Sequence, residues 1–170
     1  MASLIETLID VLEKENTEYE KLLELSMEKT GIIVDGNVDA LNEIVAKEQQ
    51  LVDRINTLEK KRTEATNDIA IVLNKKPDML TLEYMTELLA GQKKECDALK
   101  SVHDRLKKTL GNMVRVNDNN KELLRESIDM VQFEINLMQS LRQAPATANY
   151  SGSGYTEEGY GAIGSFDAKQ

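Results

Sequence analysis

The sequence has few aromatic residues, few prolines and a single cysteine. Of its 170 residues only 4% are aromatic, two are Pro, one is Cys and none is Trp. A chain this poor in aromatic residues and 30% charged suits helical bundles better than a compact α/β core. The lone Cys96 cannot form an internal disulfide, so a reducing compartment is expected.

Excess basic charge and long apolar runs are also missing. The formal net charge is -9, and phosphate binding requires a basic face, so no nucleic-acid partner is expected. The longest unbroken apolar run, Ile69 to Leu73, is far shorter than the roughly 20 residues of a membrane span. The N-terminus lacks the basic region of a secretory signal. These features predict a cytoplasmic protein without membrane insertion.

The residues needed for catalysis are scarce. The single His, His103, lies seven residues from Cys96, which on a helix places the two side chains roughly 10 Å apart. That distance is too long for a nucleophile and its base, and no metal-ligand spacing or Gly-rich phosphate loop is present. The sequence therefore predicts no catalytic residue, no metal and no cofactor, and both side chains are expected to be core or half-buried.

Helical heptads fill the chain up to about Gln143. Apolar residues recur at steps of three and four in three long segments, which end near Ile32, near Lys76 and near Leu141. Asp35-Gly36-Asn37 predicts the first turn, with Asn37 or Asp39 as the N-cap of the second helix. The predicted inward positions are, in the first segment, Ile5, Leu8, Leu12, Glu15, Tyr19 and Leu22; in the second, Leu41, Ile44, Glu48, Leu51, Ile55, Leu58, Arg62, Ala65, Ile69 and Val72; and in the third, Cys96, Leu99, His103, Leu106, Leu110, Met113, Asn117, Asn120, Leu124, Ser127, Val131, Glu134, Met138 and Leu141.

These segments predict an all-α fold. Residues 1–143 are expected to form an elongated antiparallel three-helix coiled-coil bundle, with a short helix after Pro77. Residues 144–170, rich in Gly, Tyr and Ser, are expected to form a disordered tail. Polar residues at the inward positions Asn117, Asn120, Glu48 and Arg62 are expected to fix helix register, and Glu48 and Arg62 each need a partner across an interface or exposure to water.

The segment Leu123 to Leu141 is unusually apolar. Ten of its 19 residues are apolar, more than one heptad face uses, so two apolar stripes result. One stripe can pack on the bundle, and the other could bind an amphipathic helix of a partner; alternatively, both are covered within the bundle. The candidate binding residues are Leu123, Leu124, Met130, Val131, Leu137, Met138 and Leu141.

The tail carries three tandem Tyr-x-x-x-Gly pentads, beginning at Tyr150, Tyr155 and Tyr160, and ends soon after Phe166. Tyr is enriched where interfaces form, and repeated anchors raise the effective concentration for one docking pocket. A solvated end without a role is the alternative.

Several motifs stand out in the first 62 residues: Tyr19-x-x-Leu22-Leu23, the turn Asp35-Gly36-Asn37-Val38, Leu41-x-x-Ile44-Val45-x-x-Glu48 and Leu58-Glu59-x-x-Arg62. In these motifs and in their order, this part of the chain resembles the FlgN-type flagellar export chaperones. The third helical segment is similar only in pattern, and the tail only in style.

The resemblance implies a cytoplasmic chaperone of type III flagellar export. Such a protein would bind the C-terminal helical segments of hook-associated proteins, which form the hook-filament junction, and prevent premature association. It would deliver them to the cytosolic domain of the export gate and to the export ATPase complex. By this analogy Leu123 to Leu141 would hold the substrate, and Tyr150, Tyr155, Tyr160 or Phe166 would dock at the gate. A monomer or small homo-oligomer is then expected, whereas the alternative, a coiled-coil scaffold or adaptor, would self-assemble.

Overall fold

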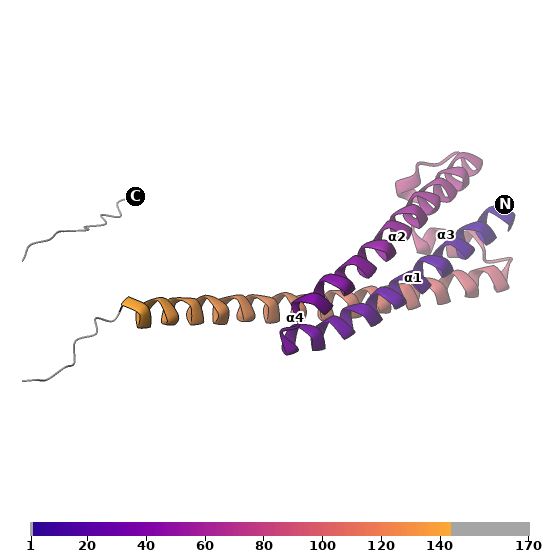
Figure 1. Ribbon diagram of the computed structural model, residues 1–170. Coiled ribbons are helices and arrows are strands. Elements are labelled where there is room, and N and C mark those ends of the chain that lie inside the picture. Colours follow the sequence, from indigo (N-terminus) through magenta and orange to yellow (C-terminus); the bar gives the residue numbers. More distant parts are fainter. Residues whose placement is uncertain (1, 144–170) are drawn as a thin grey trace, which may run out of the picture. The chain divides into compact units, whose positions relative to one another are not determined.

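The computed structural model describes residues 2–143, and all regular structure in that range is helical (Figure 1). The elements are α1 (Ala2–Asp35), α2 (Val38–Leu73), a 3-10 helix η1 (Pro77–Met79), α3 (Leu82–Leu88) and α4 (Lys93–Gln143). The predicted all-α class and the short helix after Pro77 are confirmed. The predicted tail, residues 144–170, lies outside the described residues.

Local sequence signals explain where the helices begin and end. Gly36 has a φ of +66°, a left-handed conformation that suits glycine, and Asn37 caps α2 by accepting a hydrogen bond from the Ala40 amide at 3.0 Å. Asn74 ends α2 with a φ of 51°. Thr81 caps α3 by accepting from the Tyr84 amide at 3.2 Å. The first helix ends at Asp35 rather than near Ile32, because Gly36 supplies the turn.

Polar contacts define the direction of neighbouring helices. Ion pairs join Glu15 to Arg62 and Lys29 to Glu48, so α1 and α2 run antiparallel. Hydrogen bonds join Thr109 to Asn16 and Asn120 to Ser26, with sequence separations of 93 and 94 residues. Because that separation is nearly constant, α1 and α4 run parallel, and α1 contacts both of the other long helices.

The buried core consists of two clusters. One buried cluster joins α1, α2, α3 and α4, and a smaller one joins α1, α2 and α4. The larger cluster contains Ile5, Leu8, Leu12, Ala65, Ile69, Ala70, Leu80, Met85, Leu89, Leu99, Val102 and Leu106, and the smaller contains Leu22, Leu51, Ile55 and Met113. The coiled-coil geometry of these contacts stays a prediction.

Some predicted inward positions are wrong. On α4, Val102 and Thr109 are buried where His103 and Leu110 were expected, and Leu110 is exposed. A polar residue can take the inward place here because the Thr109 hydroxyl donates to Asn16 Oδ1 at 3.1 Å. On α2, Val72 is exposed and Ala70 is buried instead.

The chain divides into a compact unit that ends at Phe133 and a second unit that begins at Glu134. The boundary falls inside α4, which is continuous through Gly111. The features that follow belong to the first unit unless stated otherwise.

Candidate protein-binding site

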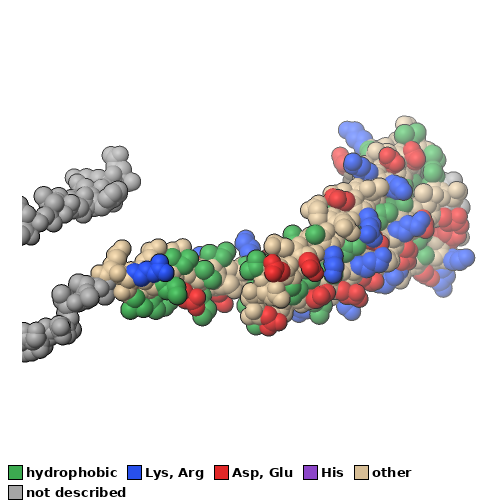
Figure 2. Space-filling view, in the orientation of Figure 1, with side chains coloured by type: hydrophobic (Ala, Val, Ile, Leu, Met, Phe, Trp, Pro, Cys, Tyr) green, Lys and Arg blue, Asp and Glu red, His purple; other side chains and the backbone are tan. Residues whose placement is uncertain are grey.

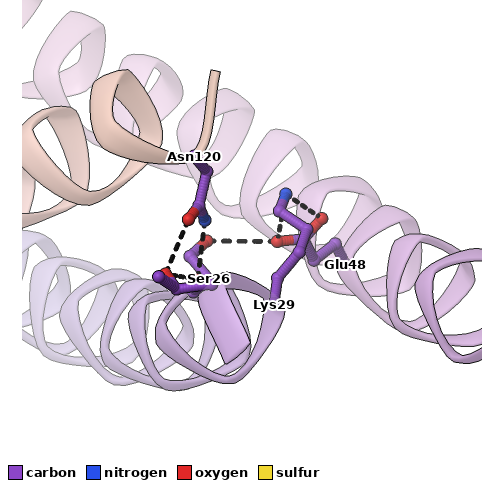
Figure 3. Close-up of polar contacts among 5 residues, drawn as sticks. Ser26, Lys29, Glu48 and Asn120 are labelled. Carbon is purple, nitrogen blue, oxygen red and sulfur yellow. Dashed lines mark hydrogen bonds and ion pairs between the residues drawn. The ribbon is translucent and has the colours of Figure 1, made fainter. Parts of the chain in front are cut away.

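A buried polar network links the three long helices. The Asn120 amide nitrogen donates to the Ser26 carbonyl oxygen at 2.7 Å, and Asn120 Oδ1 accepts from the Thr30 hydroxyl at 2.6 Å. The Ser26 hydroxyl donates to Glu48 at 3.1 Å, and Lys29 Nζ contacts both Glu48 carboxylate oxygens at 2.8 and 2.7 Å (Figure 3). Glu48 thus has the partners that the sequence required of it, and Asn120 joins α4 to α1 in the same network, which holds the helices in register.

A second buried carboxyl group lies nearer the start of α1. Glu15 is 2% exposed, and its carboxylate lies 3.3 Å from Arg62 Nε. Burial raises the pKa of the Glu15 carboxyl above its usual value; Arg62 opposes this shift, and the charge of Glu59 adds to it. Burial also raises the pKa of Tyr19. Arg62 therefore has a partner on another helix, as the sequence required, and that partner is Glu15.

An open groove, here called the central groove, lies beside the polar network. Its volume is about 650 Å³, and α1, α2 and α4 all contribute side chains. The lining residues include the apolar Leu22, Val52, Met113, Leu124 and Ile128 and the polar Ser26, Lys29, Glu48, Asn117, Asn120, Lys121, Arg125 and Asp129. Asn117, expected to face inward, is exposed at the edge of this groove.

A smaller groove, here called the turn groove, lies next to the connection between α1 and α2. Its volume is about 310 Å³. It shares Leu124 and Ile128 with the central groove, so the two grooves are contiguous. The other apolar lining residues are Ile32, Ile33, Val38, Leu41 and Val131.

The C-terminal part of α4 exposes a series of large apolar side chains. Their exposed fractions range from 43% to 68%, and Figure 2 shows hydrophobic side chains gathered along this part of the helix. The series consists of Ile128, Met130, Val131, Phe133, Ile135, Leu137, Met138 and Leu141, the last four in the second unit. Met130 and Val131, one from each stripe, are exposed within the first unit, so there the alternative that both stripes are covered within the bundle is wrong.

The predicted binding residues fall into two groups. Leu123 and Leu124 are half-buried, and Leu124 lines both grooves. Met130, Val131, Leu137, Met138 and Leu141 are all exposed. Ile128, which also lines both grooves, was not among the predicted residues, although its place one helical turn after Leu124 was a signal that it shares that face. The binding role of all these residues stays a prediction.

The predicted docking residues Tyr150, Tyr155, Tyr160 and Phe166 lie outside the described residues. Cys96 and His103 are both half-buried, as expected. Cys96 contacts the Thr86 carbonyl oxygen at 3.8 Å, and His103 lies beside Asp104 at 3.4 Å. Within residues 2–143, no group of three His, Cys, Asp or Glu side chains could hold a metal ion. In the same range, no helix combines the length and apolar character needed to cross a membrane.

Comparison with known proteins places the chain in a family. The family model described as FlgN protein matches residues 1–158. The uncharacterized protein YvyG of Bacillus subtilis (strain 168) is 25% identical over 131 residues, which cover 77% of this chain and 78% of YvyG. No solved structure matches the chain significantly. Since the family model covers most of the sequence, including all three long helices, the chain belongs to the FlgN family, whose members are flagellar export chaperones rather than enzymes.

Proposed function

We propose that this protein is a cytoplasmic chaperone of type III flagellar export for hook-associated proteins. It binds their C-terminal helical segments, keeps them from associating before export, and delivers them to the export gate. A three-helix coiled-coil bundle formed by α1, α2 and α4 is the scaffold in this proposal. The observation that carries the proposal is the series of exposed apolar side chains on α4 from Ile128 to Leu141.

Exposed apolar side chains in such a series are unusual for a helix that has no partner. A surface helix normally turns its apolar stripe to the core, whereas here the stripe is accessible. An amphipathic helix of the unexported subunit would cover these side chains. Its own apolar face would then be buried and could not associate with other subunits. The two methionines of the series, Met130 and Met138, adapt their shape to different partner sequences.

Delivery is proposed to use the tail. In this proposal Tyr150, Tyr155, Tyr160 or Phe166 docks at the cytosolic domain of the export gate, and the export ATPase complex is a further partner. The support is the family membership and the regular spacing of the tyrosines.

The test is capture of hook-associated proteins of the same organism by the full chain after co-expression. Met130→Glu should weaken capture by about tenfold or more, because burying one such side chain is worth roughly 1.5–3 kcal/mol. Val114→Glu is the matched control, since Val114 is 61% exposed on the same helix, close to the 64% of Met130, but lies outside the series.

Equal loss of capture in both variants would contradict the proposed site. Failure of the unchanged chain to capture any hook-associated protein would contradict the proposed function. Sedimentation of the isolated protein separates this function from a scaffold: a chaperone should be a monomer or a small homo-oligomer, whereas a scaffold should assemble through the same stripe without a partner.

A further inference from the structure

The central and turn grooves together have the length of a helix. They are contiguous through Leu124 and Ile128, and their lining extends along α4 from Met113 to Gln132. At 1.5 Å per residue this stretch is about 28 Å long, enough for roughly five turns of a second helix beside it. Both grooves lie within the compact unit that ends at Phe133.

Apolar side chains continue along the whole length of the lining, beside the polar residues of the central groove. Leu22 and Val52 contribute from α1 and α2 in the central groove, and Leu124 and Ile128 continue the apolar surface into the turn groove. A helix placed here could bury an apolar stripe against three helices at once. The occupant must therefore be amphipathic, since its other faces would remain in water.

The charges at the central groove are unevenly matched. Lys29 and Glu48 neutralise each other at 2.7 Å. Lys121 and Arg125 line the same groove, are exposed, and make no ion pair with any residue in the range 2–143. They are four residues apart on α4 and so lie on one face, one turn from each other. Asp129, one turn after Arg125, is the other charged residue of this lining, so outside the Lys29–Glu48 pair two positive charges face one negative charge. In a chain whose net charge is -9, this local positive excess is a site for negative charge.

We propose that the central and turn grooves bind a partner helix that is amphipathic and carries acidic residues along one flank, with two carboxylates one turn apart facing Lys121 and Arg125. This inference rests on the proposed function and specifies the chemistry of the segment that the chaperone binds. It also adds α1 and α2 to the binding surface, through residues such as Leu22 and Val52. The apolar contacts supply most of the affinity, and the ion pairs select among apolar helices.

The test uses two synthetic helical peptides of about 19 residues, a length set by the grooves. They share one apolar stripe and differ only on one flank, which carries Glu at two positions four residues apart in the first peptide and Lys in the second. The full chain should bind the Glu peptide about fivefold more tightly, the size expected of two exposed ion pairs. The preference should disappear at about 1 M salt, where the Debye length is roughly 3 Å.

Charge reversal makes the test specific. Lys121→Glu together with Arg125→Glu should invert the order, so that the Lys peptide binds more tightly. A variant that had merely lost structure would weaken both peptides and could not invert their order. Lys107→Glu together with Lys108→Glu is the matched control, because it makes the same charge change at exposed α4 positions that line neither groove.

Three results would overturn the proposal. The first is equal affinity of the full chain for the two peptides, and the second is a preference for the Glu peptide that persists in the charge-reversed variant. The third is that neither peptide binds, while the full chain self-associates and the charge-reversed variant does not. The last result would assign the grooves to a second copy of this chain. Capture of hook-associated proteins is measured on the same variants. Capture without any peptide preference would refute the groove proposal and leave the chaperone function standing, whereas the reverse would support the groove and refute the proposed substrates.

Discussion

Asn120 offers the sharpest test of the polar network. Its side chain is 2% exposed and makes two hydrogen bonds across the contact between α4 and α1, at 2.7 and 2.6 Å. Asn120→Ala removes both bonds. A typical hydrogen bond contributes about 1 kcal/mol net, so the two together predict a loss of about 2 kcal/mol in the free energy of unfolding.

The partners of Asn120 limit the loss to that size. The Thr30 hydroxyl also lies 3.2 Å from the Ser26 carbonyl oxygen, so after the substitution it can donate there instead. Neither partner is then left buried and unpaired, and the additional penalty of about 1–3 kcal/mol for an unsatisfied buried group does not arise. A much larger measured loss would show that the network acts as a cooperative unit rather than as two separate bonds.

The measurement is urea unfolding followed by circular dichroism at 222 nm. With a urea dependence of roughly 2 kcal/mol per molar, a loss of 2 kcal/mol lowers the midpoint by about 1 M. Asn117→Ala is the matched control, because Asn117 is exposed on the same helix one turn earlier, and it should change stability by less than about 0.5 kcal/mol. Equal shifts in the two variants would refute the reasoning.

Three further predictions concern stability. Gly111→Ala should raise the free energy of unfolding by about 1 kcal/mol, since an added Cβ meets nothing within 4 Å in a continuous helix. Gly36→Ala should lower the free energy of unfolding, because the φ of Gly36 is +66°. Urea titrations that show a change of the same sign in both variants would contradict this reasoning. The folded-state pKa of Glu15 lies above the usual 4.5. Between pH 4.5 and that folded-state pKa, the native state therefore binds more protons than the unfolded chain. The contribution of this group to stability is present below pH 4.5 and is lost as the pH rises through the folded-state pKa. The stability of Glu15→Gln relative to the unchanged chain should therefore increase between pH 4 and pH 7, as measured by unfolding at both values. A relative decrease on going to pH 7 would contradict the sign. Met138→Glu should leave the thermal midpoint within about 2 °C, because its side chain is 65% exposed, and a clear drop in calorimetry would mean that the side chain already packs against part of the chain.

Local signals in the sequence were sufficient to locate the turns between the helices and to identify an inward polar residue that needs a partner. Asn37 was identifiable as a cap because its amide oxygen can accept the free amide at a helix start. The requirement that Glu48 have a partner followed from its inward place, and Lys29 and Ser26 meet it. The identity of those partners was not predictable, because it depends on how two helices are aligned, which the heptads of either helix alone do not fix.

The choice between adjacent inward positions on α4 could not be made from hydrophobicity. A pattern of apolar residues favours Leu110 over Thr109, yet the polar side chain is the buried one. What decides the choice is Asn16 on α1, whose side-chain oxygen accepts from the Thr109 hydroxyl. Asn16 is itself 1% exposed, so each of the two polar residues makes the burial of the other tolerable. A pairing of this kind is visible only when both helices are in place.

The exposure of the α4 stripe follows from register and helix length together. Paired positions on α1 and α4 are separated by 93 or 94 residues, and α1 ends at Asp35. The last residue of α4 with a residue of α1 opposite it is therefore close to Ile128, where the series of exposed apolar side chains begins. Asn120 lies about two turns before this point, and its two hydrogen bonds to α1 fix the register that leaves this end of α4 without a residue of α1 opposite it. The register that stabilises the bundle is thus also the one in which the apolar side chains of α4 beyond Ile128 are left without a residue of α1 opposite them.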